Sequence, residues 1–176
     1  MTAWDRPPTA QVWDELVATL KSASGVLCVA HVSPDGDALG SAMAAALAIR
    51  QVGVDAFVSF DEDPFVLPGS LAWLPGAELL RSPAEIPASV DVVVSFDASD
   101  LARLGRLGDV ANQARVFAAI DHHRSYTGFA TLSVVDVQAP ATAVLAMELS
   151  DRLGAELTTD IATCIYAGLT TDTGSF

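Results

Sequence analysis

Cysteines, basic residues and long apolar runs are all scarce in this sequence. Its two cysteines, Cys28 and Cys164, each lie in an apolar run, which argues against a disulfide framework and predicts buried packing roles for both. The longest apolar stretches, such as Ala42 to Ile49, fall well short of the roughly 18 consecutive residues that a membrane-spanning helix needs. The N-terminus also lacks the basic leader and the apolar core of a secretory signal. We therefore expect a cytoplasmic protein that has no transmembrane segment.

The shortage of basic residues limits the partners that this protein can bind. Nine Lys and Arg residues stand against 22 Asp and Glu residues, so the formal net charge is −13. Binding to long nucleic acid depends on many Lys and Arg side chains that replace condensed counterions, so no long duplex partner is expected. A phosphate substrate would then require divalent cations to offset the local repulsion.

The composition is that of one folded domain. Hydrophobic residues make up 51% of the 176 positions and charged residues 18%, which is typical of a globular protein and not of a disordered one. The length suits a single core, and the sequence contains no internal repeat or low-complexity tract.

Short apolar runs alternate with segments of helical periodicity. The runs predict strands over 26–30, 56–60, 92–96, 116–120 and 131–137, the last of them a candidate edge strand. Helical spacing predicts helices over 9–22 with Thr9 as N-cap, 38–51, 141–153 and 160–169, and five prolines between 64 and 87 preclude a long helix there. This alternation indicates an α/β fold with a doubly wound, mostly parallel sheet of Rossmann-like type.

Polar side chains follow three of the predicted strands at the point where each strand ends. His31 follows the first strand, Asp97 follows the strand over 92–96, and Asp121, His122 and His123 follow the strand over 116–120. In doubly wound sheets ligands bind outside the carboxyl ends of the strands. We therefore expect these residues to converge in space.

The first polar loop contains three potential metal ligands within seven residues, His31, Asp35 and Asp37. Pro34 restrains its backbone and Gly36 permits unusual dihedral angles, so the loop can direct these side chains to one point. Two structural readings compete: Asp37 as the N-cap of the following helix, and His31 as an ordinary histidine at a strand end.

The other strand ends offer an acid and an acid–histidine tripeptide. Asp97 follows the run VVVSF, whereas Asp100 is interpreted as the cap of a short helical segment that begins at Leu101. If His122 binds a metal, Asp121 can orient the neighbouring groups and His123 can donate a proton to a phosphate or to a leaving oxygen. The alternative is a solvated polar turn.

The segment from Gly168 to Phe176 contains Asp172 and, taken alone, is typical of a turn that follows a helix. Together the loops supply six candidate ligands, namely His31, Asp35, Asp37, Asp97, His122 and Asp172. Histidine and carboxylate ligands without thiolates suit Mn²⁺ or Mg²⁺. Six ligands fit two ions, which at a separation of about 3.5–4 Å can activate water for phosphate-ester hydrolysis.

Taken in order, the segments HVSPDGDALGS, VSFDASD, DHH and GLTTDTGSF resemble the four motifs of the DHH phosphoesterase family. The resemblance extends from Val26 to Phe176, and the first motif is most similar to that of the oligoribonuclease and 3′-phosphoadenosine-5′-phosphate phosphatase branch, the nano-RNases. It implies a manganese-dependent enzyme with two ions that acts on short RNA or small nucleotides, including dinucleotides. Family members are often homodimers.

The resemblance also implies a role for each site residue. His31 and Asp35 would bind one metal, Asp37, His122 and Asp172 the other, and Asp97 both. Asp121 would not bind a metal but would fix the orientation of the neighbouring histidine or of the backbone. His123 would contact the scissile phosphate or assist the leaving group. Independently of the resemblance, we expect Arg124, the next residue, to contact the substrate.

Two departures from the family pattern stand out. After DHH this chain continues with Arg124, Ser125 and Tyr126, where relatives often have a serine and an asparagine. The chain over 1–176 corresponds to the catalytic domain alone, whereas family enzymes continue into a second, substrate-binding domain. We therefore expect half of the substrate cleft and doubtful activity in isolation.

Two other functions fit the same residues. The metals would serve equally for hydrolysis of inorganic pyrophosphate or polyphosphate. The domain could also be a nucleotide-binding module without turnover.

Overall fold

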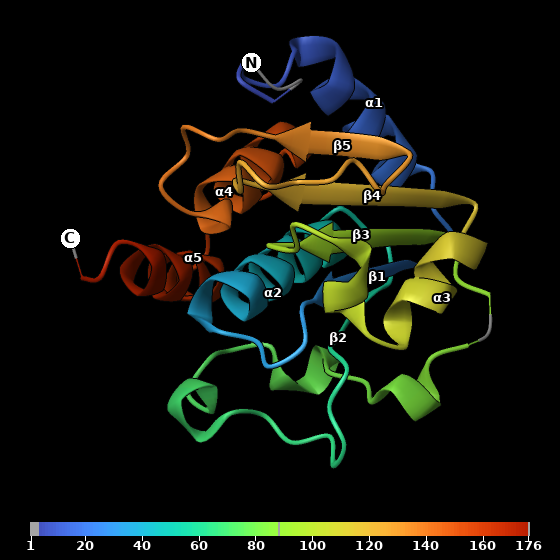
Figure 1. Cartoon of the computed structure of the whole chain (residues 1–176), viewed down its shortest axis with the longest axis vertical. Coiled ribbons are helices and arrows are strands. Elements are labelled where there is room, and N and C mark those ends of the chain that lie inside the picture. Colours follow the sequence, from blue (N-terminus) through green and yellow to red (C-terminus); the bar gives the residue numbers. More distant parts are fainter. Residues whose placement is uncertain (1–3, 88, 176) are drawn as a thin grey trace.

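The computed structural model describes residues 4–87 and 89–175, and these form a parallel five-stranded sheet between two layers of helices (Figure 1). The strand order is β2-β1-β3-β4-β5, and every neighbouring pair is parallel. The strands are β1 (Val26–Ala30), β2 (Ala56–Ser59), β3 (Val92–Phe96), β4 (Val116–Asp121) and β5 (Leu132–Val135). The prediction of a doubly wound α/β sheet is confirmed, and β5 is an edge strand as expected.

Apolar side chains leave the strands on both faces, and each face packs against its own helices. Cys28 and Ala30 belong to the larger core, whereas Leu27 and Val29 of the same strand belong to the smaller one. The larger core contains the helices α1 (Ala10–Lys21), α2 (Gly36–Gln51), α4 (Thr142–Leu153) and α5 (Thr159–Asp172). The smaller core contains α3 (Leu107–Gln113) and the short 3₁₀ turn η4 (Leu101–Leu104). Burial on both faces explains why the strand sequences are continuously apolar.

The ends of the helices show where the sequence-based expectations were incomplete. α1 has Thr9 as its N-cap, as predicted. α2 begins at Gly36 and not at Ala38, because the carboxylate of Asp35 caps it by accepting from the backbone amides of Asp37 and Ala38, each at 3.0 Å. The seven-residue helix α3 was not predicted at all.

The prediction that the fourth motif follows the last helix was wrong. α5 continues through Asp172, so the segment Gly168–Asp172 is helical and only the residues after it form a turn. The two threonines of this segment, Thr170 and Thr171, donate their hydroxyls to the carbonyl of Ala167 at 3.0 and 2.8 Å, which accommodates them within the helix. Phe176, the last residue of that motif, lies outside the described residues.

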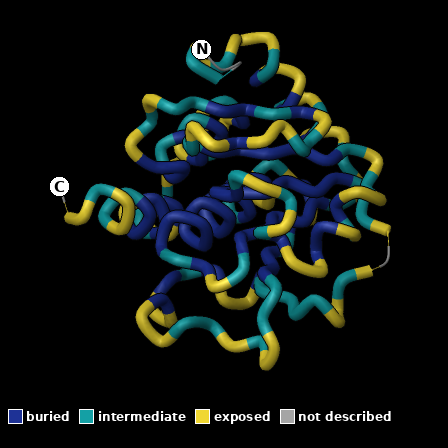
Figure 2. Tube along the Cα trace, in the orientation of Figure 1, coloured by how far each residue is buried: buried dark blue, intermediate teal, exposed yellow. Residues whose placement is uncertain are grey.

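Helices α2 and α5 approach closely because glycines lie at their contact, where a Cβ atom on Gly40 of α2 would lie 3.3 Å from the backbone nitrogen of Gly168. A Cβ atom on Gly168 of α5 would lie 2.6 Å from Cβ of Ala143 and 2.7 Å from Oδ1 of Asp37. Almost all of α2 is buried in this arrangement (Figure 2). The three helices α2, α4 and α5 therefore meet directly beside the Asp37 carboxyl group.

Both cysteines are free and buried, as predicted. Among the described residues, none of the helices has the length and apolar character required to cross a membrane. The described part of the irregular segment between β2 and β3 contains three short 3₁₀ turns and no α-helix, in agreement with the effect expected of its prolines.

Candidate metal centre

The polar strand ends converge at the point where the strand order reverses. In the order 2-1-3-4-5 the switch lies between β1 and β3, and this is where doubly wound folds bind their ligands. His31 follows β1 and Asp97 follows β3 at this crevice. The structure brings all six candidate ligands together there in three overlapping groups, and within each group the ligand atoms lie within 4.8 Å of one another. One of the groups consists of Asp97, His122 and His123, so His123 also lies within reach of a shared ion.

The first group consists of His31, Asp35 and Asp97. Nε2 of His31 lies 3.9 Å from Oδ2 of Asp35 and 3.7 Å from Oδ2 of Asp97. The other ring nitrogen, Nδ1, lies 2.8 Å from the backbone carbonyl of Val32, to which it donates its proton. The lone pair of Nε2 therefore faces the carboxylates. This atom is buried without a hydrogen-bond partner, as expected of a nitrogen that binds a metal.

The second group, Asp37, His122 and Asp172, has the same construction. Nε2 of His122 lies 3.0 Å from Oδ2 of Asp172 and 3.9 Å from Oδ2 of Asp37. The 3.0 Å contact lacks hydrogen-bond geometry, because this nitrogen too is buried without a hydrogen-bond partner. Nδ1 of His122 faces the carbonyl of Ala139 at 3.2 Å. A backbone carbonyl thus orients each imidazole of the two groups.

Asp97 lies between the two groups and contacts both. Its Oδ2 faces Nε2 of His31, while its Oδ1 lies 3.5 Å from Nε2 of His122 and 2.9 Å from the hydroxyl of Thr142, which donates to it. The residue has a φ of 58°, a strained conformation for a non-glycine residue and a frequent feature of functional sites. Burial opposes its ionisation, but contacts from His31 and Thr142 outweigh that effect and lower the pKa of Asp97.

Asp37 is fully buried at the start of α4. The backbone amides of Thr142 and Ala143 donate to its two carboxyl oxygens at 2.7 and 2.8 Å. It therefore caps α4, and the alternative that it caps its own helix is wrong, since Asp35 does so. Burial and the nearby charge of Asp97 raise the pKa of Asp37 to about 8, against the opposing effect of the two amides.

Asp121 and His123 form a pair beside these groups. Oδ1 of Asp121 lies 2.7 Å from Nδ1 of His123 and also accepts from the backbone amides of His122 and His123, at 2.8 and 3.1 Å. This pairing is the main cause that raises the pKa of His123 to about 9. The ring is therefore protonated at neutral pH, and its orientation is fixed by the carboxylate.

The side chain of Arg124 is paired with a residue of the N-terminal segment. Its guanidinium lies 2.6 Å from the carboxylate of Asp5, and the side chain is 69% exposed. The neighbouring Trp4 donates its indole N–H to the carbonyl of Tyr126 at 3.1 Å. Substrate contact by Arg124 stays a prediction, and it would require this ion pair to open.

Sequence reasoning missed Thr142, which donates its hydroxyl to Asp97 and its amide to Asp37. A threonine at the start of a helix has no sequence signal that separates this role from ordinary capping. The carbonyls of Val32 and Ala139 were likewise invisible to it, because any residue type provides a carbonyl. The interpretation of Asp100 as a cap is confirmed, since its carboxylate accepts from the amide of Ala102 at 2.9 Å.

The chemistry of these donors fits divalent metal ions. Four carboxylates lie around two imidazole nitrogens that have no proton donor or acceptor of their own, and no thiolate is among the ligand groups. Carboxylate repulsion is visible at Asp172, where burial and the charge of Asp97 raise the pKa. A cation between the groups would remove this repulsion and occupy the imidazole lone pairs, and borderline-hard ions such as Mn²⁺ and Mg²⁺ match the ligand types.

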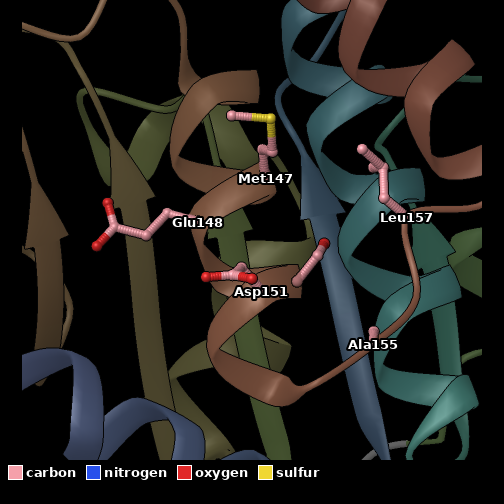
Figure 3. Close-up of a pocket in the computed structure, with 6 residues that line it drawn as sticks. Met147, Glu148, Asp151, Ala155 and Leu157 are labelled. Atoms are coloured by element: carbon pink, nitrogen blue, oxygen red, sulfur yellow. The ribbon is translucent and has the colours of Figure 1, made fainter.

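A separate cavity of about 400 Å³ lies between α4 and the loop that leads to α5 (Figure 3). It is lined by Met147, Glu148, Ser150, Asp151, Ala155 and Leu157. None of the six candidate ligands contributes to it, and Glu148 is paired with Arg152 at 2.8 Å. The chemistry expected of this protein therefore lies at the strand ends and not in this cavity.

Comparison with known proteins gives the relatives of this chain. Residues 25–169 match the DHH family, N-terminal domain. The chain is 37% identical to the bifunctional oligoribonuclease and PAP phosphatase NrnA of Thermus thermophilus, over 96% of this chain and 51% of that protein. It is 26% identical to the probable bifunctional oligoribonuclease and PAP phosphatase NrnA of Streptococcus mutans, over 92% of this chain and 49% of the relative.

A solved structure has the same fold. The crystal structure of an exopolyphosphatase-related protein from Bacteroides fragilis superposes with a TM-score of 0.85 at 27% identity, over 96% of this chain and 52% of that chain. The chain therefore spans about half the length of the relatives that it matches.

Proposed function

The chain belongs to the DHH family of phosphoesterases, and from this membership and the site geometry we propose that it hydrolyses short oligoribonucleotides and 3′-phosphoadenosine 5′-phosphate with the help of two divalent cations. One observation carries the proposal. Two imidazoles present buried Nε2 atoms without hydrogen-bond partners to carboxylates from three different segments of the chain. Such atoms are costly to bury unless a ligand compensates them.

The ligands divide naturally into two sets. His31 and Asp35 would hold one cation, and Asp37, His122 and Asp172 would hold the other. Asp97 would contribute to both sets, because its two oxygens face different imidazoles. When bound, the cations supply a lowered pKa for a coordinated water and charge stabilisation for the phosphoryl oxygens. Manganese is the cation that we propose, with magnesium as its substitute.

The remaining groups position the ligands and move protons. Thr142 fixes the rotation of the Asp97 carboxylate, and the first amides of α4 fix that of Asp37. The Asp121 carboxylate keeps His123 protonated, so its free ring nitrogen, Nε2, can donate to the leaving oxygen as the phosphate ester bond breaks. A metal-activated water would supply the nucleophile, and His123 would act as the general acid.

Two relatives named as bifunctional oligoribonuclease and PAP phosphatase support the choice of substrates. The net charge of −13 also favours small substrates, since the protein offers few cations for a long nucleic acid. Linear dinucleotides belong to the same chemical class and are included in the proposal.

The test is a substrate panel with Mn²⁺, Mg²⁺ or EDTA in the buffer. The protein should release mononucleotides from a diribonucleotide and phosphate from 3′-phosphoadenosine 5′-phosphate, and EDTA should abolish both reactions. Inorganic polyphosphate and pyrophosphate belong in the same panel, because the Bacteroides fragilis relative is described as exopolyphosphatase-related. Turnover of polyphosphate alone would reject the proposed substrates, and nucleotide binding without any product would favour a binding module.

A further inference from the structure

Arg103, a residue of η4 outside all the motifs above, lies beside the metal centre. Its backbone carbonyl accepts from the amide of Val32 at 2.8 Å, which joins η4 to the loop of His31. The segment that carries Arg103 begins four residues after Asp97 and is capped by Asp100. The segment η4 is thus joined to the loop of His31 through the Arg103 carbonyl and to Asp97 through the chain itself.

The guanidinium of Arg103 is distinctive among the basic groups of the protein. Five of the nine basic residues have partners for their cationic groups: Arg81, Arg106, Arg115, Arg124 and Arg152. The structure shows no hydrogen bond or ion pair for the cationic groups of Arg6, Lys21, Arg50 and Arg103 within 4–87 and 89–175. Of these four, only Arg103 is partly buried.

An unpaired, partly buried arginine is unexpected in a chain with 22 acidic residues. Its nitrogens are absent from the buried polar atoms that lack partners, so the guanidinium reaches solvent. Asp121 chiefly raises the pKa of His123, and the charge of Arg103 opposes this rise. Burial lowers the pKa of His31, but contacts with Asp97 and the Val32 carbonyl outweigh burial and raise the pKa overall, and the charge of Arg103 opposes that rise. The guanidinium therefore lies within electrostatic reach of both imidazoles.

We propose that Arg103 binds a nonbridging oxygen of the substrate phosphate that His123 contacts. A planar guanidinium with five N–H donors is well suited to phosphate. A bound anion would therefore provide the ion-pair partner that Arg103 does not have among the described residues. The cations and Arg103 would then hold the phosphate from two sides. The identity of the substrate in this inference rests on the proposed function, whereas the binding of an anion at Arg103 does not.

The decisive variants are Arg103→Gln, Arg103→Lys and, as matched control, Arg50→Gln, which removes the same charge from an exposed position near the end of α2. With Mn²⁺ present, Arg103→Gln should bind AMP and inorganic phosphate about 10- to 100-fold more weakly by equilibrium dialysis or calorimetry, the effect expected of a charged hydrogen-bond partner. Adenosine binding should be unchanged. Arg103→Lys should retain part of the affinity, and Arg50→Gln should resemble the parent protein.

For 3′-phosphoadenosine 5′-phosphate, Arg103→Gln should raise KM more than it lowers kcat, while Mn²⁺ affinity and thermal unfolding change little. Unchanged binding of AMP and phosphate would overturn the proposal, and so would an equal loss for adenosine or a loss that follows weaker Mn²⁺ binding. Phosphate binding is measured without turnover. If the parent protein hydrolyses no nucleotide, the proposed function fails while the anion site is still decided by the phosphate titration.

Discussion

The strand β3 has an aspartate at each end, and the two residues differ in the partners that surround them. Asp91 precedes the strand at its amino end, where Arg115 donates to both of its carboxyl oxygens and the amide of Ser24 adds a third bond. Asp97 follows the strand at its carboxyl end, where the neighbours are two imidazole nitrogens and further carboxylates. The residue type and the strand are the same, but one carboxylate is fully satisfied and the other is not.

The difference distinguishes carboxylates that stabilise the fold from those that serve chemistry. Arg115 and Ser24 lower the pKa of Asp91 to about 2, because they favour its ionised form. At the other end, burial and like charge raise the pKa of Asp37, and Asp97 adopts a positive φ. Carboxylates that lie next to one another, together with a strained backbone, indicate a site that binds a cation.

The largest difference in activity should appear when Asp97 and Asp91 are each replaced by asparagine in separate variants. Asp97→Asn should lower phosphoesterase activity at least about 100-fold, since it removes the ligand that faces both groups, and even groups behind a ligand typically contribute that much. Asp91→Asn should leave the activity within about twofold of the parent. A twofold change corresponds to less free energy than a typical hydrogen bond contributes. Initial rates at saturating Mn²⁺ measure both. Similar losses in the two variants would break the comparison.

A second, smaller effect is expected at His123. His123→Gln should lower kcat about 100-fold, because glutamine cannot donate the proton that a protonated imidazole transfers. Binding of Mn²⁺ should change much less than kcat, because His123 is not among the six proposed ligands. Steady-state rates and a Mn²⁺ titration separate the two quantities. A kcat close to that of the parent would exclude His123 as the proton donor.

The pH dependence of metal binding should sharpen the comparison further. Because the pKa of Asp37 is about 8, this carboxyl group has to lose its proton before it can hold a cation. Mn²⁺ affinity should therefore rise as the pH increases towards 8, by up to about tenfold per unit, and then flatten. Calorimetric titrations between pH 6 and pH 9 test this, and an affinity independent of pH would contradict it.

In the metal-free protein the same carboxyl group should act on stability with the opposite sign to Asp91. A raised pKa means that the folded state retains the proton of Asp37 more strongly, so its contribution to stability falls as the pH rises from about 4 to about 8. The lowered pKa of Asp91 gives stability that is present above about 4 and is lost towards pH 2.

The smallest effect is accordingly that of Asp91→Asn on folding. It should lower the free energy of unfolding by about 1 kcal/mol at pH 7, a modest value because the Arg115 side chain is 54% exposed and solvent screens the pair. The difference from the parent should vanish near pH 2. Urea unfolding at the two pH values measures it, and an equal loss at both would assign the effect to packing.

Local patterns were sufficient to predict much of the fold. Continuous apolar runs mark β1, β3 and β4 because these strands are covered on both faces, and Thr9 marks the start of α1. The helix α3 escaped prediction because its seven residues carry little periodicity. The end of α5 was misjudged because threonine and aspartate near a helix end are equally typical of the turn that follows.

The sequence by itself determined which residue types stand at the strand ends, since strand length and residue order place His31, Asp97 and His122 directly after apolar runs. Only the tertiary structure decided which of them share a ligand group, that Asp37 caps α4 from 105 positions away, and that the cationic group of Arg103 is left without a partner of its own. The physical reason is that a strand end is a local property, whereas hydrogen bonds and charge neighbours depend on segments that only the packing of α2, α4 and α5 brings together.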